Sequence, residues 1–273
     1  MKSLIKMITI LILFSVTFFA LRFYGEYIGY DVDHLVANLD GVAWLYSTIG
    51  TIFAVLAAFV IVSEIGDWNT LLESSREEVK ELNELYQWSK SLSPELSNEF
   101  KENIQKYLAI IVEKEWNEVR DTGNENEKAR LTMDKFHSLI SKAVVENPDI
   151  ASFMFSTLDE IVDKRAMRVE FSFDTVPKVT KYTAILVDVA LILLSFFIGV
   201  TSMWLDYIFQ ICIVALGSVI LFVIDDLDNP LREGDWCLRP DLYKKLLSQI
   251  QHSHNEASLS EETKPLFDTA VNQ

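Results

Sequence analysis

The sequence predicts an all-α integral membrane protein with four transmembrane helices and a long cytoplasmic helical domain between the second and the third. Half of the 273 residues are hydrophobic, and they gather in four blocks. Each block is close to the roughly 17–25 residues that span a bilayer core. Between the second and third blocks, apolar residues recur at helical spacing without the alternation typical of strands. The four blocks are Leu4–Tyr24, Val42–Ile65, Thr183–Trp204 and Tyr207–Ile224.

The blocks are too apolar to be core helices of a soluble protein, which would place a polar residue at every third or fourth position. Residues 208–224, for example, include only a glutamine, a cysteine and a serine as polar side chains. The first block could instead be a signal peptide, because Lys2 and Lys6 precede it. However, Phe18 and Ala20 near its end do not offer two small residues to a peptidase.

Basic residues set the expected orientation. The connection over residues 25–41 has no Lys or Arg, whereas sixteen basic residues lie between Asp67 and Lys181. The positive-inside rule therefore predicts that both termini and the long segment are cytoplasmic.

These features divide the chain into six segments. The first transmembrane helix and a short extracytoplasmic loop precede the second transmembrane helix, the cytoplasmic helical domain and a transmembrane hairpin. We expect the outer turn of this hairpin around Leu205 and Asp206. An acidic turn with a helix and a disordered polar tail complete the chain. In order, the segments cover residues 1–41, 42–65, 66–182, 183–224, 225–249 and 250–273.

The cytoplasmic domain is expected to contain four helices. The first continues out of the second membrane block, because residues 67–91 contain neither Gly nor Pro. Ser93 and Pro94 are typical of an N-cap and a first helical position, and predict a second helix that ends near Gly123. The third and fourth helices are predicted over residues 128–145 and from 150 to about 173, separated by Asn-Pro-Asp.

Composition and motifs exclude several functional classes. The formal net charge of −16 argues against a nucleic-acid partner, because phosphate binding requires a basic surface. The sequence contains no phosphate-binding P-loop, GxSxG elbow, HExxH motif or GxGxxG after a strand, so we expect neither an enzyme nor a cofactor. His252 and His254 lie in a polar tail without a third ligand, and no metal site is expected.

Asp188 is the one acidic residue in the interior of a predicted span, since Glu64 is the penultimate residue of the second block. A charge at the centre of a membrane helix costs about 2.5–3.5 kcal/mol on insertion scales, so it is normally paired or faces water. Two interpretations stay open. Asp188 pairs with Lys181 or with a basic residue of a neighbouring helix, or it lines a pore, where it would favour cations.

The second predicted span combines bulky and small residues, with Phe53 and Phe59 among Gly50, Ala54 and Ala57. Small residues permit close helix packing. Bulky apolar residues could form a hydrophobic constriction if several copies surrounded an axis. Ordinary helix packing explains the same residues, so both interpretations stay open.

The cytoplasmic segment and the end of the last span resemble the bestrophin-like domain family. The motif after the last span is LDNPLREGDW, and the resemblance covers roughly residues 44–247. The other residues that carry it are Leu85, Tyr86, Leu92, Pro94, Tyr107, Glu115, Trp116, Gly123, Arg165, Arg168 and Pro177.

The resemblance implies a homo-oligomeric ion channel, with an axial pore lined by the second transmembrane helix of a homopentamer. It further implies a bacterial inner membrane, with membrane lipid and inorganic ions as partners. The alternative is a non-conducting membrane scaffold or sensor whose acidic helical domain binds a partner. Together with Asp188, the pore-lining candidates are Ile52, Phe53, Leu56, Phe59 and Val60.

An acidic turn follows the last span and includes Asp225, Asp226, Asp228, Asn229, Pro230, Glu233 and Asp235. In animal bestrophins the similar stretch forms a calcium clasp, but here Leu231 replaces a phenylalanine. Negative charge at a helix C-terminus opposes the helix dipole, so these carboxylates need basic partners or a cation. We expect an ion-paired structural turn, with a cation site and plain solvation as alternatives. The candidate partners are Arg232, Arg239, Arg165 and Arg168.

Overall fold

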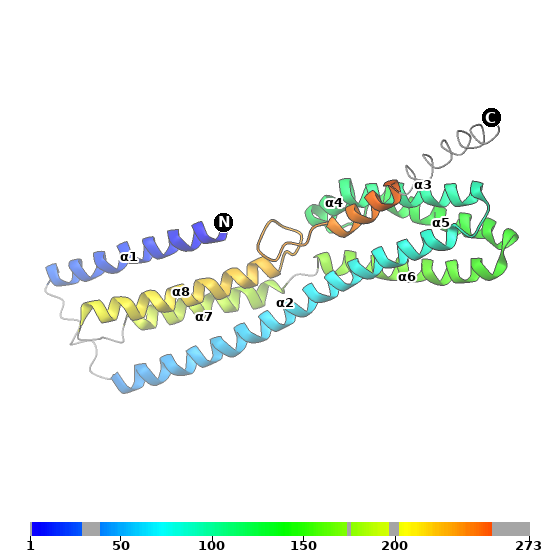
Figure 1. The fold of residues 1–273 in the computed structure, drawn as a ribbon. Coiled ribbons are helices and arrows are strands. Elements are labelled where there is room, and N and C mark those ends of the chain that lie inside the picture. The colour runs from blue at the N-terminus through cyan, green and yellow to red at the C-terminus, as the bar shows by residue number, and fades with distance from the viewer. Residues whose placement is uncertain (1, 29–38, 174–175, 197–201, 253–273) are drawn as a thin grey trace, which may run out of the picture. The chain divides into compact units, whose positions relative to one another are not determined.

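The computed structural model describes residues 2–28, 39–173, 176–196 and 202–252, and every regular element in these ranges is helical. Most of the predicted first extracytoplasmic loop and most of the predicted disordered tail lie outside them. The helices labelled in Figure 1 are α1 (Lys2–Ile28), α2 (Leu39–Ser89), α3 (Pro94–Ile110), α4 (Trp116–Thr122), α5 (Glu127–Glu146), α6 (Pro148–Phe173), α7 (Lys178–Ser195) and α8 (Met203–Leu227). A further helix covers residues 241–252.

The chain forms two compact units. Unit 1 comprises residues 1–67 and 175–237, and unit 2 comprises residues 68–174 and 238–273. The long helix α2 contributes to both units, because its 51 residues run from Leu39 to Ser89 without interruption. This continuity agrees with the expected extension of the second membrane block into an amphipathic helix.

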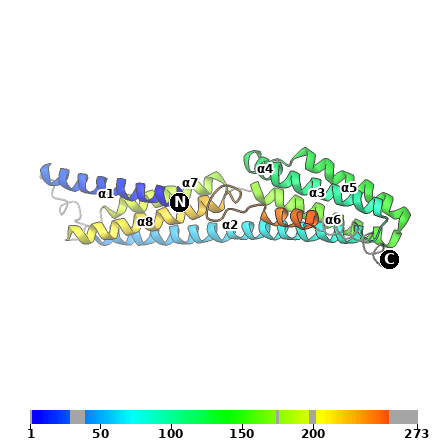
Figure 2. The same ribbon diagram turned by 45° about the horizontal axis from the view of Figure 1, so that its top comes forward.

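Unit 1 is built from apolar helices, of which α8 contacts both α1 and α7. Figures 1 and 2 show α7 and α8 running side by side. Among the described residues, three helical segments are long and apolar enough to cross a membrane: Ile5–Tyr24, Ala43–Ser89 and Met203–Leu227. The predicted third span begins inside α7, and residues 197–201 within it lie outside the described ranges.

The outer turn predicted around Leu205 and Asp206 is wrong, because both residues lie in the first turn of α8. Asp206 is buried there and forms an ion pair with Arg22 of α1. It also accepts a hydrogen bond from the side-chain amide of Gln210, at 2.8 Å. The ion pair and the hydrogen bond compensate for burying the charge of Asp206, so this residue can lie within the helix instead of in a turn.

Unit 2 packs α3, α5 and α6 around an apolar core, and α3 and α5 lie alongside each other in both views (Figures 1 and 2). Local signals set its helix ends. Ser93 caps α3 by accepting the N–H of Leu96, and Pro94 takes the first helical position. Gly123 ends α4 in the left-handed conformation, with φ of 72°.

The predicted second cytoplasmic helix is interrupted, which the sequence did not indicate. A π-helical turn, Ile111–Glu115, separates α3 from α4. The wider turn changes the helical register immediately before Trp116. Both Glu115 and Trp116 are buried, and Glu115 joins the charged cluster described below.

Candidate functional site

The membrane part of α2 has two different faces. Phe53, Ala57 and Val60 are buried in unit 1, whereas 56% of Ile52 and 75% of Phe59 is exposed. A helix turns by about 100° per residue, so Phe53 and Phe59 lie about 120° apart around the axis. The pore-lining candidates on this helix therefore do not share one face.

The buried face of α2 packs into the core of unit 1. Val60 forms a cluster with Val176 and with Ile224 of α8. Leu56 is partly buried and lies between the two faces. The exposed face carries Ile52, Val55, Phe59 and Val62.

Asp188 of α7 is buried beside α8. A Cβ atom at Gly217 would overlap the Asp188 carboxylate, so glycine at this position leaves room for the acid. The ammonium group of Lys181 instead pairs with Asp228 and, at 3.9 Å, with Asp225. Within the described ranges Asp188 has no ion pair or hydrogen bond, so the pair with Lys181, which was one of the open interpretations, is not formed.

The acidic turn forms a compact set of contacts in unit 1. Asp225 pairs with Arg232 at 2.8 Å, which is one of the arginines expected there. Asp228 is buried, pairs with Lys181, and accepts the backbone N–H of Val176 at 2.7 Å. Asp228 thus connects the end of α8 to the start of α7 through an ion pair with Lys181 and a hydrogen bond from the backbone of Val176.

Asp226 closes the turn in a different way. Its carboxylate accepts the backbone N–H groups of Asp235 and Trp236, at 2.8 and 3.2 Å. A Cβ atom at Gly234 would overlap this carboxylate, so only glycine permits the approach. Among the described residues, no group of three or more His, Cys, Asp or Glu side chains could hold a metal ion.

Unit 2 contains a buried charged cluster that was not predicted from the sequence. It is formed by two carboxylates, two guanidinium groups and two phenols. Its members are Glu78, Glu115, Arg165, Arg168, Tyr107 and Tyr243, all buried. Arg165 and Arg168 were expected to serve the acidic turn, and that expectation is wrong because their guanidinium groups are held by acids of this cluster.

Arg168 lies at the centre of the charged cluster. Its Nε donates to Glu78 and its Nη2 donates to Glu115, both at 2.7 Å. The guanidinium carbon also lies 5.7 Å from the ring centroid of Trp116 and 5.6 Å from that of Tyr243. Charge, hydrogen bonds and aromatic faces therefore compensate for taking this cation out of water.

The remaining contacts satisfy the two carboxylates. The hydroxyls of Tyr107 and Tyr243 donate to Glu78, at 2.7 and 2.8 Å. Burial and the nearby charge of Glu78 raise the pKa of both phenols well above their usual value, so they remain donors. Arg165 donates to Glu115 at 2.8 Å and to Glu125 at 2.7 Å.

Glu115 is held in its charged form. Burial would raise the pKa of this carboxyl, but the guanidinium groups of Arg168 and Arg165 and their hydrogen bonds outweigh that effect and lower it. The sequence did contain a signal for the cluster. Arg165 and Arg168 continue the spacing of buried residues that Leu158 and Ile161 begin on α6.

Long apolar helices in unit 1 and a compact helical unit 2 define the chain as a helical membrane protein. Residues 34–234 match the family described as "Bestrophin-like domain", and the chain belongs to this family. A comparison with curated proteins finds no match.

Solved structures share the fold. A variant of a bacterial bestrophin homolog from Klebsiella pneumoniae is similar with a TM-score of 0.67 at 10% identity, over 92% of this chain and 98% of that one. A second variant of this homolog has a TM-score of 0.66 at 12% identity, over 92% and 97%. A protein described as a membrane protein has a TM-score of 0.68 at 10% identity, over 92% and 96%.

Proposed function

We propose that the protein is a homo-oligomeric ion channel, assembled as a homopentamer around an axial pore. The observation that carries the proposal is the exposed apolar face of α2 in a member of the bestrophin-like family. In an oligomer, helices of neighbouring subunits would pack against this face of α2. Bulky apolar residues from several copies of α2 around a common axis would form a hydrophobic constriction.

The two-faced character of α2 supports a narrower choice of pore residues. Ile52 and Phe59 are exposed, and Leu56 lies beside them, so these three are the proposed lining of the constriction. Phe53 and Val60 are buried in the same subunit, and their proposed role is to hold α2 in place. Asp188 is buried as well, and would contribute a negative field near the pore instead of direct contact with the ion.

The proposed topology has four spans in a bacterial inner membrane, with both termini and unit 2 in the cytoplasm. Support comes from the asymmetry of Lys and Arg residues around the predicted spans. Membrane lipid would cover the apolar surface that the oligomer leaves exposed. The post-membrane acidic turn would act as a structural clamp for the ends of the last two spans, since its contacts involve Lys181, Val176 and Arg232.

A second candidate function is a non-conducting scaffold or sensor whose acidic domain binds a partner. It is favoured by the negative charge of the chain, −16. Purified protein should distinguish the two. We expect a pentamer mass in detergent and ion flux in liposomes, whereas a monomer or dimer without flux would exclude the channel.

Substitution of Phe59 tests the pore assignment. We expect Phe59→Ala to change conductance or ion selectivity while the oligomer remains intact. Phe209→Ala is the matched control, because Phe209 is also an exposed aromatic residue of a membrane helix but belongs to α8. An equal change in both variants would contradict the assignment of Phe59 to the pore.

A further inference from the structure

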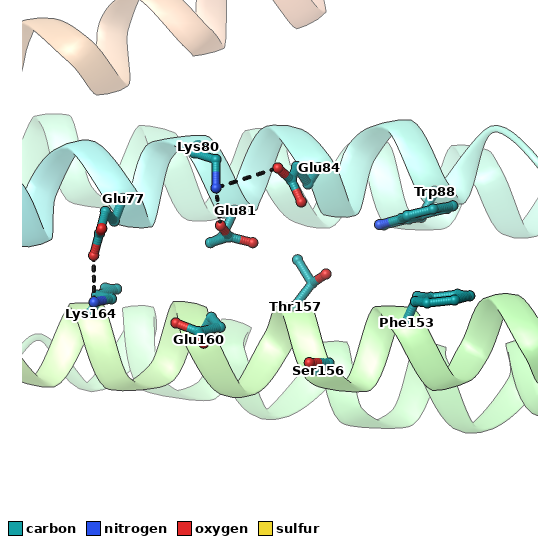
Figure 3. Close-up of a pocket in the computed structure, with 10 residues that line it drawn as sticks. All are labelled: Glu77, Lys80, Glu81, Glu84, Trp88, Phe153, Ser156, Thr157, Glu160 and Lys164. Atoms are coloured by element: carbon teal, nitrogen blue, oxygen red, sulfur yellow. Dashed lines mark hydrogen bonds and ion pairs between the residues drawn. The ribbon is translucent and has the colours of Figure 1, made fainter.

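A groove on unit 2 has features of a binding site that the channel proposal does not use. It lies between α2 and α6, has a volume of about 380 Å³, and is drawn in Figure 3. One wall carries acidic side chains of α2, and the other carries Thr157, Glu160 and Lys164 of α6. Both walls belong to the same compact unit.

Thr157 is the first sign of a ligand. Only 7% of this residue is exposed, and its side chain projects from α6 toward α2 in Figure 3. Elsewhere in unit 2, the hydroxyl of Thr132 donates to the carbonyl oxygen of Lys128 at 2.7 Å. The hydroxyl of Thr157 makes no hydrogen bond within the described part of the chain. The residue is thus largely buried while its hydroxyl faces the groove, where it offers a donor and an acceptor.

The charge of the groove is the second sign. Four glutamates and two lysines line it, which leaves two negative charges. Lys80 is shared by Glu81 and Glu84, at 2.8 and 3.5 Å, as the dashed lines of Figure 3 indicate. Lys164 pairs with Glu77, whereas Glu160 has no ion pair among the described residues. A ligand with two positive charges would neutralise the groove.

The spacing of the acids favours a particular shape of cation. Glu77, Glu81 and Glu84 follow one another at intervals of about one helical turn, and a turn rises about 5.4 Å. Amino groups separated by three or four methylenes stand roughly 5–6 Å apart when the chain is extended, given C–N and C–C bonds of about 1.5 Å. Successive amines of such a chain can therefore approach successive carboxylates.

Aromatic side chains complete the groove at one end. Trp88 and Phe153 stack with ring centroids 5.3 Å apart and an interplanar angle of 12°. More than half of Phe153 is exposed, so the pair offers an apolar surface to methylene groups and aromatic faces to a cation. Figure 3 shows this pair continuing the line of acidic residues along α2.

We propose that this groove binds an aliphatic diamine or polyamine. Its amines would pair with Glu84 and Glu160 and with the oxygens that Lys80 leaves free on Glu81. The hydroxyl of Thr157 would accept an N–H at the floor of the groove, and the methylenes would lie against Trp88 and Phe153. This proposal is independent of the proposed channel function, because amine binding is measured directly on the purified protein and needs no ion flux.

The test is calorimetric titration of full-length protein in detergent with spermidine and with 1,4-diaminobutane. The probes for comparison are n-butylamine, which has one amine, and magnesium chloride at matched ionic strength. We expect spermidine to bind at least about tenfold more tightly than n-butylamine, since each of its two additional amines can form a further ion pair worth up to about fivefold in affinity. Spermidine that binds no better than n-butylamine or magnesium would overturn the proposal.

Variants that remove acidic and basic side chains of the groove should change the affinity for spermidine in opposite directions. The double variant Glu84→Gln with Glu160→Gln should weaken spermidine binding about three- to tenfold, whereas Lys80→Gln should tighten it, because it removes a competing cation. Thr157→Val should also weaken binding. Glu170→Gln is the matched control, since Glu170 is an exposed acid of α6 outside the groove. An equal loss in that control would mean that only general charge attraction is present, and would refute the site.

Discussion

Arg168→Met should destabilise unit 2 more than any change of an exposed charge. Arg168 is 1% exposed and bonds to two fully buried carboxylates. After its removal Glu115 still has Arg165, whereas the partners that Glu78 retains among the described residues are the hydroxyls of Tyr107 and Tyr243. The variant therefore leaves a buried charge on Glu78 without a cation.

Removing one partner of a buried ion pair costs about 3–5 kcal/mol. In a protein of about 150–250 residues, each kcal/mol lost from the free energy of unfolding lowers the Tm by about 2–4 °C. The expected decrease in the Tm of Arg168→Met is therefore about 6–20 °C. Adding Glu78→Gln should recover about 1–3 kcal/mol, because it removes the unpaired charge while the amide oxygen still accepts from the tyrosines. Methionine is the chosen replacement because it keeps most of the apolar volume of the arginine stem.

The assay is thermal unfolding of the full-length protein in detergent, at neutral pH. Arg130→Met is the matched control, since Arg130 is exposed on α5 and has no ion pair among the described residues. We expect this control to shift the Tm by no more than about 2 °C. A loss in Arg168→Met that equals the control, or a double variant less stable than the single one, would refute the reasoning.

Three further variants test separate contacts. The pKa of Glu115 is lowered because the two guanidinium groups outweigh the effect of burial, so on acidification the unfolded chain binds a proton at this carboxyl before the folded protein does. The stability of the folded state should therefore fall as the pH drops below about 4.5. Glu115→Gln should flatten this part of a plot of Tm against pH. Gly217→Ala should cost about 1–3 kcal/mol in thermal unfolding, since the methyl group displaces Asp188; an unchanged Tm would contradict the close contact. Asp228→Asn should cost about 1–3 kcal/mol by weakening the bond to Lys181, and a calcium-dependent Tm that this variant abolishes would favour a cation site instead.

Helix ends were the most predictable part of the fold, because single residues determine them. Ser93 and Pro94 begin α3, and Gly123 ends α4 with positive φ. The break between α5 and α6 falls at Asn147, whose side chain accepts the N–H of Ile150. In each case the signal is a local backbone requirement that does not depend on tertiary contacts.

Features that depend on distant contacts could not be predicted in this way. Asp206 belongs to a helix because Arg22, far away in sequence, compensates its charge. The π-helical turn before Trp116 has no residue pattern that marks it. Arg165 and Arg168 look like surface charges until Glu78 and Glu115 are known to be buried beside them. Charges on helices are usually solvated, so the sequence favoured the wrong environment.

The candidate pore residues illustrate the same limit inside the membrane. In a soluble helix, polarity distinguishes the outer face from the core, but a membrane helix is apolar on both faces. Phe53 and Phe59 therefore look equivalent in sequence, although one is buried and the other is exposed. Only packing within the subunit separates them. Ala57 lies one turn after Phe53 and is also buried, which indicates that the small residues on this side serve contacts inside the subunit. The bulky side with Ile52 and Phe59 remains available for the axis of an oligomer, so conductance should respond to Phe59→Ala and stability to Phe53→Ala.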